Sequence, residues 1–445
     1  MAGGECRGLA GRYFSGPGAG SGVIFSLVSR PELAMIKRIR REQLKPGMFI
    51  HDLNCSWMVH PFLLNAFLLE DEKTIDEMAG YGIRELFIDT GKGLDVEGAQ
   101  TQEEFDTEIH DRFTKHTESI PSRGSSPVPK HSLRDEIVVA KDIHHDAYQI
   151  AHRLLMDARL GRQIEVERLE PVVGRIADSV LRNPDALVSL SRIKTKDNYT
   201  FEHSVSVCVL LITFCQALGY ERKVLMEVGV GGLLHDVGKM MVPDDILNKP
   251  SALTPPEFAL MQSHAHIGAE MLKQTPGIPE IAVVIAAQHH ERIDGTGYPD
   301  RLKQDGISHF GQMASIVDVY DALTSNRIYH QSIEPTAALK KLFEWGKSHF
   351  NEELVHHFIR AIGIYPVGSL VRLESGLLGV VVEPDNENLL HPTVRIVYDV
   401  TSGTFVPPHD MDLSKPPAGT EGDKIVGHES PRKWHIDPYA YLQPQ

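Results

Sequence analysis

Histidine and aspartate residues recur through the middle of the chain where their side chains could bind metal ions. They are His203, the pair His235 and Asp236, His264, the pair His289 and His290, and Asp318. Imidazole nitrogen and carboxylate oxygen suit iron, manganese or zinc, and no cysteine accompanies them to supply the sulfur ligands typical of structural zinc. Each group lies on a different expected helix or helix end, so several helices could bring these side chains to one point.

The number of candidate ligands favours two metal ions. Seven candidates are too many for one catalytic ion that keeps a coordination position open for water. Adjacent residues on a helix diverge by about 100°, so His235 and Asp236 can approach two ions, and Asp236 is expected to bridge them. Lys239 lies on the same helical face, from which its ammonium group can reach an anion at the metals.

Some of these residues have plainer explanations when taken singly. His203 within HSVSVCVLLI and His264 within SHAHIG could each be a core histidine with satisfied hydrogen bonds. The pair His235 and Asp236 follows the apolar run VGVGGLL, which is expected to be buried. Ionisable groups at such a place cost free energy unless they are paired or bound to metal. We therefore interpret this pair as functional.

The apolar pattern divides the chain into a helical block between two smaller units. Apolar residues recur at helical spacing from about 136 to 362, whereas short alternating runs precede and follow this block. The expected fold is mainly α: an all-helical bundle domain, preceded by a small α+β domain and followed by a short β-rich segment. The expected units are a flexible extension (1–34), the α+β domain (35–116), a linker (117–135), a connecting helical segment (136–170), the domain with the candidate ligands (171–365), the β-rich segment (366–410) and an irregular tail (411–445).

Composition restricts the partners and the compartment. The formal net charge of −15 argues against a broad basic surface for a nucleic-acid polymer. Cys6, Cys55, Cys208 and Cys215 show no disulfide or metal-binding spacing, so we expect reduced cysteines and a cytoplasmic location. The longest apolar runs, such as VCVLLI, are far shorter than the roughly 20 residues that span a bilayer, so no membrane span is expected.

The segment HHERIDGTGYP at 289–299 combines the three short motifs HHE, DG and GYP at fixed spacing. Together with the His-Asp pair and the lysine at 235–239, it resembles the HD-GYP subgroup of the HD-domain phosphohydrolases, over roughly 171 to 365. The resemblance implies a bacterial signalling enzyme, a cyclic di-GMP phosphodiesterase that forms linear pGpG, or GMP, and influences biofilm formation or motility. Residues 35 to about 170 are similar to a domain of unknown function that often precedes HD-GYP domains.

The resemblance also implies roles for individual residues. The seven His and Asp residues match the metal ligands, Asp236 matches the bridging one, and Lys239 matches a lysine that contacts the scissile phosphate. The implied substrate-binding residues are Lys239, Arg327, Tyr298 and His330. The residues implied to support the GYP loop, within 289–299, and the metal ligands are Asp294, Gly295, Gly297, Pro299 and Asp321. The loop is implied to contact either the ligand or proteins with diguanylate cyclase (GGDEF) domains.

Two positions depart from the family pattern. Tyr199 occupies the position at which some members have a glutamate that helps to hold a third metal, so we expect two ions, either iron or manganese. His330 replaces a lysine or arginine of some members, which predicts weaker or pH-dependent substrate binding because histidine loses its charge near neutrality. The hypothesis is in-line attack on a phosphodiester by a hydroxide activated by two metals, with Lys239 stabilising the phosphate charge.

Two alternatives remain open at the level of sequence. One is a receptor or signalling adaptor for cyclic di-GMP with weak or vestigial hydrolysis. The other is an HD phosphohydrolase of another cyclic dinucleotide. The substitution Asp236→Ala separates enzyme from receptor, because it should abolish turnover in either enzyme, whereas a receptor would be judged by its ligand binding.

Overall fold

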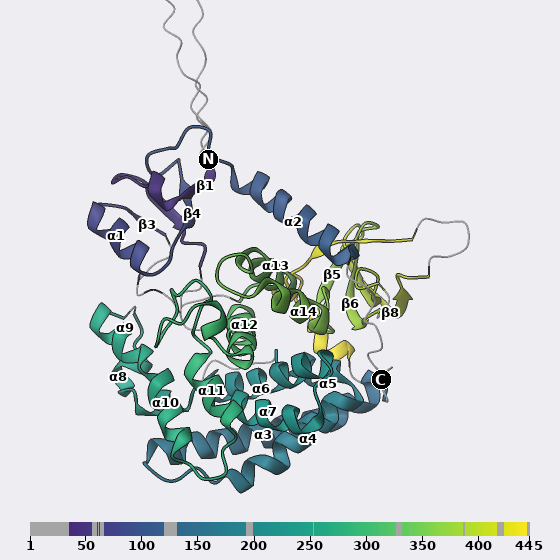
Figure 1. Cartoon of the computed structure of the whole chain (residues 1–445). Helices are drawn as coiled ribbons and strands as arrows, with labels where there is room; N and C mark the ends of the chain where they lie inside the picture. The colour runs from purple at the N-terminus through teal and green to yellow at the C-terminus, as the bar shows by residue number, and fades with distance from the viewer. Residues whose placement is uncertain are drawn as a thin grey trace, which may run out of the picture.

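The computed structural model describes residues 35–55, 60, 62, 66–119, 131–192, 199–251, 253–325, 332–385, 388–415 and 422–442. In this part of the chain a small sheet precedes a large block of helices, and a second sheet follows the block (Figure 1). The predicted class is confirmed: the fold is mainly α, with a small α+β unit before the helices and a β-rich segment after them.

The N-terminal unit is an antiparallel sheet with a short helix packed against it. Its described strands are β1 (Ile36–Arg40), β2 (Phe49–Asp52), β3 (Phe67–Leu68) and β4 (Glu85–Asp89), in the spatial order β1-β4-β2-β3. The helix α1 (Glu72–Gly80) begins at Asp71, whose carboxylate accepts the backbone N–H of Thr74, and it buries Met78 in the core of the sheet. A longer helix, α2 (Gln102–Ser119), follows the sheet and crosses towards the helical block (Figure 1).

The helical block has one continuous apolar core. Its described α-helices are α3 (Leu133–Arg159), α4 (Leu169–Arg182), α5 (Pro184–Leu190), α6 (Tyr199–Ala217), α7 (Arg222–Leu234), α8 (Asp244–Leu247), α9 (Pro255–Gln262), α10 (His264–Lys273), α11 (Glu280–Gln288), α12 (His309–Thr324), α13 (Pro335–Trp345) and α14 (Glu352–Ile362). The side chains of Ser132, Asn183 and Ser308 accept backbone N–H groups at the first turns of α3, α5 and α12, which explains where these helices begin. Most of the expected connecting segment, 136–170, is α3, and it packs in the same core as α4 to α7.

The close packing of α6 against α7 positions two of the candidate metal ligands. A Cβ added to Gly232 on α7 would lie only 2.7 Å from the Cα atom of Cys208 on α6, so no larger residue fits. This contact brings the end of α7 next to the beginning of α6, which are the positions of His235 and His203. By length and composition Thr200–Ala217 could cross a membrane, but 78% of this stretch is buried inside the protein, as in a core helix.

The C-terminal sheet is larger than expected. Its described strands are β5 (Leu370–Leu373), β6 (Leu377–Glu383), β7 (Thr393–Asp399), β8 (Thr404–Asp412) and β9 (Ile425–His428), in the antiparallel order β8-β7-β6-β5-β9. The prediction of an irregular tail from residue 411 is wrong for the strand residues 411–412 and 425–428, for the short helix α15 (Pro431–Trp434) and for the 3₁₀-helix η6 (Pro438–Tyr441). The strand β9 is short and pairs with β5, more than 50 residues earlier in the chain, so its own sequence contains no strong strand signal.

Candidate metal centre

Seven buried His and Asp side chains meet inside the helical block, and all seven were predicted. They come from the start of α6 (His203), the end of α7 (His235, Asp236), the start of α10 (His264), the end of α11 (His289, His290) and the middle of α12 (Asp318). Each is at most 2% exposed. The helix α6 packs against α7 and α12, and α11 packs against α7, α10 and α12 (Figure 1), so the site depends on tertiary packing.

Asp236 lies between two groups of histidines. Its Oδ1 atom is 3.2 Å from His264 Nε2 and 3.5 Å from His289 Nε2. Its Oδ2 atom is 3.3 Å from His235 Nε2 and 3.6 Å from His203 Nε2. The two sets of residues that could each hold one metal ion therefore share Asp236. This arrangement is the one that a bridging carboxylate requires.

Asp318 and His290 complete the cluster. The Oδ1 atom of Asp318 lies 3.2 Å from His203 Nε2, and its Oδ2 atom lies 3.5 Å from His290 Nδ1. Asp318 therefore faces a histidine from each side of the site. Its position on α12 is surrounded by apolar residues such as Val317 and Val319, both fully buried.

Three buried atoms of the cluster have no hydrogen-bond partner among the described residues: Asp236 Oδ1, His290 Nδ1 and Asp318 Oδ2. Buried polar atoms without a partner cost free energy, so native proteins rarely leave three of them together. A divalent cation would supply the missing partner for all three. The donor set, which is nitrogen and carboxylate oxygen without sulfur, also fits such a cation.

Backbone carbonyls orient the histidine rings. The Nδ1 atoms of His235, His264 and His289 lie 2.8, 2.6 and 3.0 Å from the carbonyl oxygens of Gly232, Met261 and Ala286. A carbonyl can only accept, so each Nδ1 must carry a proton, and Nε2 is the ring nitrogen that each of these histidines turns towards the cluster. Partners of this kind are typical of histidines that bind metals.

Two members of the cluster, His289 and Asp236, have pKa shifts that suit metal ligands. Burial alone would lower the pKa of His235, but the neighbouring Asp236 raises it. Burial lowers the pKa of His289 to about 4, so this ring is neutral near pH 7. Burial alone would raise the pKa of Asp236, but the neighbouring His235 and Lys239 hold it well below its usual range. A neutral imidazole beside a permanently ionised carboxylate attracts a cation.

Lys239 lies beside Asp236, although not on a continuous α-helix. The helix α7 ends at Leu234, and Lys239 belongs to a short 3₁₀-helix, η4 (Val237–Met241). The expectation that one α-helix carries 235–239 is therefore wrong in detail, because the chain turns tightly at Asp236 to pack against α10. Lys239 Nζ still donates to Asp236 Oδ2 at 2.5 Å. Its side chain is 17% exposed, unlike the candidate ligands.

The motif loop, residues 289–299, directly follows α11 and packs against the cluster. The Tyr298 ring packs on His290 with 4.6 Å between centroids and is 9% exposed. Gly295 has a φ of +80°, a conformation that favours glycine, and precedes the Gly297, Tyr298 and Pro299 turn. A Cβ at Gly297 would lie 2.4 Å from the backbone nitrogen of Arg292. The sharp bend thus holds Tyr298 against a candidate ligand.

Sequence reasoning missed two charged residues in this loop. Glu291 is 1% exposed, and its carboxylate accepts the backbone N–H groups of Asp300 and Leu302 at 2.8 and 3.0 Å. Arg292 is 3% exposed and packs 5.0 Å from the Phe350 ring centroid. The available signal was their position, since charged residues directly after two buried histidines must have internal partners. Glu291 thus joins two parts of the loop, and Arg292 packs the loop against Phe350.

Asp321 and Asp294, the two acidic residues that the resemblance implies to support the site, have different neighbours. Asp321 Oδ2 lies 2.6 Å from His203 Nδ1, on the side of the ring away from the cluster. Asp294 Oδ1 accepts the N–H of Thr296 at 3.0 Å, and its Oδ2 is 3.2 Å from Arg84 Nη2 and 3.3 Å from His349 Nδ1. The predicted residues Arg327 and His330 lie outside the described residues, as does the side chain of Tyr199.

Asp321→Asn should weaken metal binding about 10- to 100-fold, because a neutral amide makes a weaker hydrogen bond to His203 Nδ1 than a carboxylate does and orients the ring less firmly. Metal titration of the variant measures this affinity, and saturating metal should restore most of its activity. Asp142→Asn, at an exposed position on α3, is the matched control. Unchanged metal affinity in Asp321→Asn would contradict the positioning role.

Asp294→Asn should destabilise the protein by about 2 kcal/mol at neutral pH. Burial alone would raise the pKa of Asp294, but His349 and Thr296 stabilise the ionised form and lower the pKa to about 2. A lowered pKa gives stability that is complete above the unfolded value of 3.8 and is lost as the pH falls through about 2. Denaturant unfolding of both proteins should therefore show a difference that shrinks below pH 4. A difference independent of pH would contradict this explanation.

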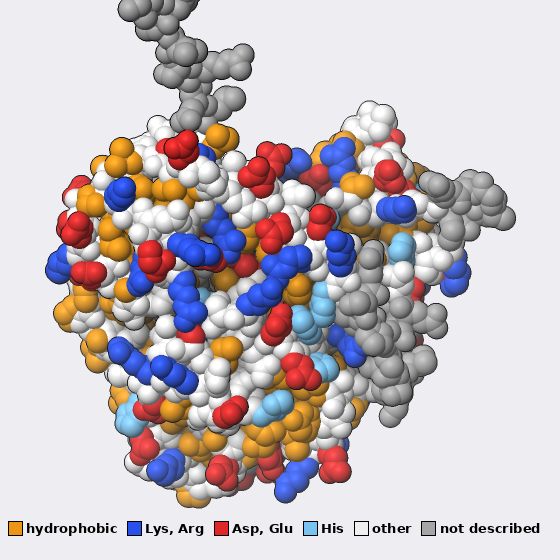
Figure 2. Space-filling model, turned by 45° about the horizontal axis from the view of Figure 1, so that its top comes forward, with side chains coloured by type: hydrophobic (Ala, Val, Ile, Leu, Met, Phe, Trp, Pro, Cys, Tyr) orange, Lys and Arg blue, Asp and Glu red, His pale blue; other side chains and the backbone are white. Residues whose placement is uncertain are grey.

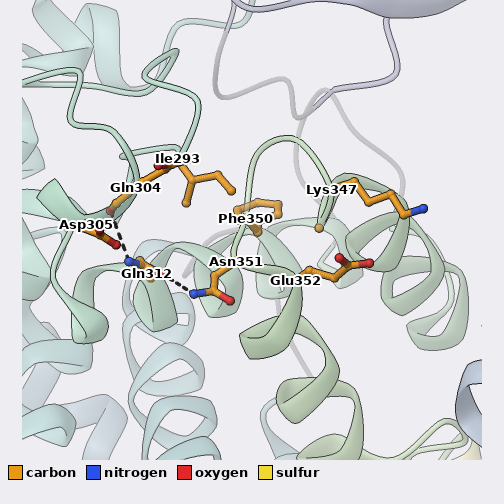
Figure 3. Close-up of a pocket in the computed structure, with 9 residues that line it drawn as sticks. Ile293, Gln304, Asp305, Gln312, Lys347, Phe350, Asn351 and Glu352 are labelled. Atoms are coloured by element: carbon orange, nitrogen blue, oxygen red, sulfur yellow. Dashed lines mark hydrogen bonds between the residues drawn. The ribbon is translucent and has the colours of Figure 1, made fainter. Parts of the chain in front are cut away.

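A hollow of about 420 Å³ lies on another side of the motif loop (Figure 3). Its lining includes Ile293, Gln304, Gln312 and Asn351 and none of the seven candidate ligands. The Gln312 amide joins the Gln304 carbonyl to the Asn351 side chain, as the dashed lines in Figure 3 show. These polar groups already have partners, so we assign the chemistry to the buried cluster.

Known families and proteins match almost the whole chain. A family model described as an HD domain matches residues 185–354, and a domain of unknown function (DUF3391) matches 36–169. The cyclic di-GMP phosphodiesterase PA4108 of Pseudomonas aeruginosa is 40% identical over 404 residues, which cover 90% of this chain and 94% of that protein. The chain belongs to the HD-GYP family.

This HD-GYP protein is also similar to a second curated phosphodiesterase and to a solved structure. The 3'3'-cGAMP-specific phosphodiesterase 2 of Vibrio cholerae is 42% identical over 123 residues, which cover 27% of this chain and 24% of that protein. A solved HD-GYP-type protein of Bdellovibrio bacteriovorus aligns with 73% of this chain and 98% of its own, at 19% identity and a TM-score of 0.43.

Proposed function

We propose that this HD-GYP protein hydrolyses cyclic di-GMP to linear pGpG, and that GMP is the product of a second cleavage. The observation that carries the proposal is the complete cluster of seven buried His and Asp side chains arranged on both sides of Asp236. Identity of 40% to a curated cyclic di-GMP phosphodiesterase over 90% of the chain supports the same substrate.

The proposed metal sites share Asp236. We assign one ion to His203, His235 and Asp236, and the other to Asp236, His264, His289 and His290, with Asp318 beside both. The nitrogen and oxygen donors support iron or manganese. Two such ions would lower the pKa of a bound water. They would also place positive charge beside the phosphate oxygens.

Lys239 supplies charge that the substrate can reach. Its side chain is 17% exposed, whereas Asp236 is 1% exposed, so the ammonium group is the part of this pair that meets a ligand from solvent. As water forms a bond to phosphorus and the bond from phosphorus to a ribose oxygen breaks, negative charge grows on the phosphate oxygens and on the leaving ribose oxygen. An ammonium group that is already held in place by Asp236 stabilises that charge without reorganising.

Lys239→Met should lower kcat by about 10²- to 10³-fold while metal content stays at the wild-type level, because methionine keeps most of the unbranched side chain but has no charge and donates no hydrogen bond. Steady-state kinetics and metal analysis on the same sample test this. Lys223→Met is the matched control, since Lys223 is 85% exposed on α7. Wild-type kcat in Lys239→Met would exclude the assigned role.

Cyclic GMP-AMP is the second candidate substrate. The observation that favours it is the 42% identity over 123 residues to a 3'3'-cGAMP-specific phosphodiesterase. That match covers 27% of this chain, against 90% for the cyclic di-GMP phosphodiesterase. We therefore place cyclic di-GMP first.

The experiment is chromatography of each cyclic dinucleotide after incubation with anaerobically purified protein loaded with iron or manganese. We expect linear product from cyclic di-GMP at a higher kcat/KM than from cyclic GMP-AMP. The reverse order would select the second candidate. Absence of product from both, at about two metals per chain, would contradict the phosphodiesterase proposal and favour a receptor.

The cellular setting follows from the same proposal. Cys55, Cys208 and Cys215 are free thiols among the described residues, which supports a reducing compartment such as the cytoplasm. Binding of diguanylate cyclase domains to the motif loop stays a prediction. In this chain Arg84 of the N-terminal unit already reaches Asp294 of that loop.

A further inference from the structure

A second hollow lies between the N-terminal unit and the helical block. Its volume is about 630 Å³, within the range of small-molecule sites. Strand β1 and the turn before β4 line one side, and the end of α13 with the residues after it lines the other. Figure 2 shows a hollow on this face with Lys and Arg side chains around it. None of the seven metal-centre residues belongs to the lining.

The hollow is cationic although the whole protein is acidic. Its lining includes the cationic side chains of Arg38, Arg40, Arg41, Arg84, Arg112 and Lys347. The acidic side chains in the lining are Glu42, Glu85 and Glu344, so the net charge of the lining is +3 in a chain of −15. Walls of one sign concentrate small ions of the opposite sign.

Two of these cations are available to a ligand. Arg38, Arg41, Arg84 and Arg112 each have an acidic neighbour. For Arg40 and Lys347 the described residues provide no acidic group within ion-pair distance, and both side chains are exposed. Arginine and lysine in this arrangement favour phosphate, which accepts several charged hydrogen bonds at once.

Buried polar atoms of the lining also have no partner. They are Arg38 Nε, Asn54 Oδ1 and Trp345 Nε1, and none has a hydrogen bond among the described residues. Asn54 is 7% exposed and Trp345 is 4% exposed. Two of these atoms are donors and one is an acceptor, so a ligand that reaches all three offers both kinds of group. Phosphate alone accepts but offers few donors, whereas a nucleobase offers both.

The hollow adjoins the motif loop. Thr296 lies in its lining, and a Cβ added to Gly82 would be 2.4 Å from Thr296 Cγ2. Arg84 Nη2 is 3.2 Å from Asp294 Oδ2. Asp294 and Thr296 lie in the same short loop as His290 and Tyr298. A ligand that attracts Arg84 therefore acts on a residue four positions from a candidate metal ligand.

We infer that this hollow is a binding site for a nucleotide, whose phosphate lies near Arg40 and Lys347 and whose base uses the unpaired groups of Asn54 and Trp345. Binding alters turnover through Arg84 and Asp294. The binding site itself does not depend on the proposed phosphodiesterase activity, whereas the effect on turnover rests on it.

The test is calorimetric titration of the full-length, metal-loaded protein with AMP, GMP, ATP and GTP, beside guanosine and inorganic phosphate. At least one nucleotide should bind about tenfold more tightly than guanosine and phosphate. The double variant Arg40→Ala/Lys347→Ala should weaken that binding about tenfold. The control Lys73→Ala/Lys223→Ala removes two cations that are more than 80% exposed elsewhere, and it should bind like wild type.

Further variants separate this site from the metal centre. Trp345→Phe removes the unpaired N–H together with part of the buried ring system, so it should weaken nucleotide binding, and its melting temperature is measured beside the titration to establish that the variant is folded. No saturable binding by any of the four nucleotides, or wild-type binding in Arg40→Ala/Lys347→Ala, would overturn the inference. Binding that Lys239→Ala abolishes and the double variant retains would place the nucleotide at the metal centre and would overturn it too.

Hydrolysis of cyclic di-GMP, measured on the same samples, keeps the two proposals apart. Nucleotide binding without hydrolysis would leave the binding site intact and contradict the proposed function. If hydrolysis occurs, a saturating nucleotide should change its rate by about twofold or more. An unchanged rate would overturn the link between the hollow and the motif loop.

Discussion

Asp236→Ala should lower turnover of cyclic di-GMP by at least about 10³-fold and deplete metal from both halves of the site. Asp236 is the residue shared by the two groups of candidate ligands. One of its oxygens faces His264 and His289, and the other faces His203 and His235. Loss of any one histidine affects one group, whereas loss of this carboxylate affects both.

The measurement is product chromatography together with metal analysis of the same protein. Asp142→Ala is the control for removal of an exposed carboxylate far along the chain, and it should behave like wild type. Asp236→Asn keeps the size and one oxygen, so it separates loss of charge from loss of packing. Turnover within about tenfold of wild type at full metal loading of Asp236→Ala would contradict the bridging role.

Removal of the metal ions should abolish hydrolysis and also destabilise the protein. The reference is protein in a solution whose metal concentration is about 1,000 times the Kd for that metal. Compared with this reference, we expect the free energy of unfolding of the metal-free protein to be lower by about 4 kcal/mol. The reason is that Asp236 Oδ1, His290 Nδ1 and Asp318 Oδ2 are buried without a hydrogen-bond partner. A bound cation satisfies these atoms only in the folded protein.

Chelation followed by chemical denaturation measures this effect, and reloading with iron or manganese should restore both stability and activity. Asp318→Ala provides the matched variant, because it lacks one candidate ligand and should gain less stability from metal. Hydrolysis that persists after the metal content has fallen to zero would contradict the assignment. So would an unfolding curve that metal does not shift in wild type.

The residues of the site were accessible from sequence because their chemistry is encoded locally. A His-Asp pair after an apolar run, and two histidines before a glycine-rich turn, are unusual enough to be noticed in one chain. The structure brings all seven candidates together. Helix periodicity likewise predicted the helical block, since each amphipathic segment shows its buried face in its own sequence.

Other features depend on contacts between distant residues, and no local pattern reports them. The strand β9 exists because β5 offers it hydrogen bonds. The end of α7 at Leu234 reflects the packing of η4 against α10, and helical periodicity alone predicts a longer helix. The packing of the Tyr298 ring on His290 was also not predicted from the sequence, although both residues belong to the motif.

Sequence by itself indicated the candidate metal ligands, the family that they resemble, and helices as the elements that carry them. Tertiary structure alone decided that each oxygen of Asp236 faces a different pair of histidines. It also decided that the N-terminal unit contacts the motif loop through Arg84 and Asp294. The physical reason is that side-chain chemistry belongs to single residues, whereas distances between side chains are set by how whole helices and sheets pack.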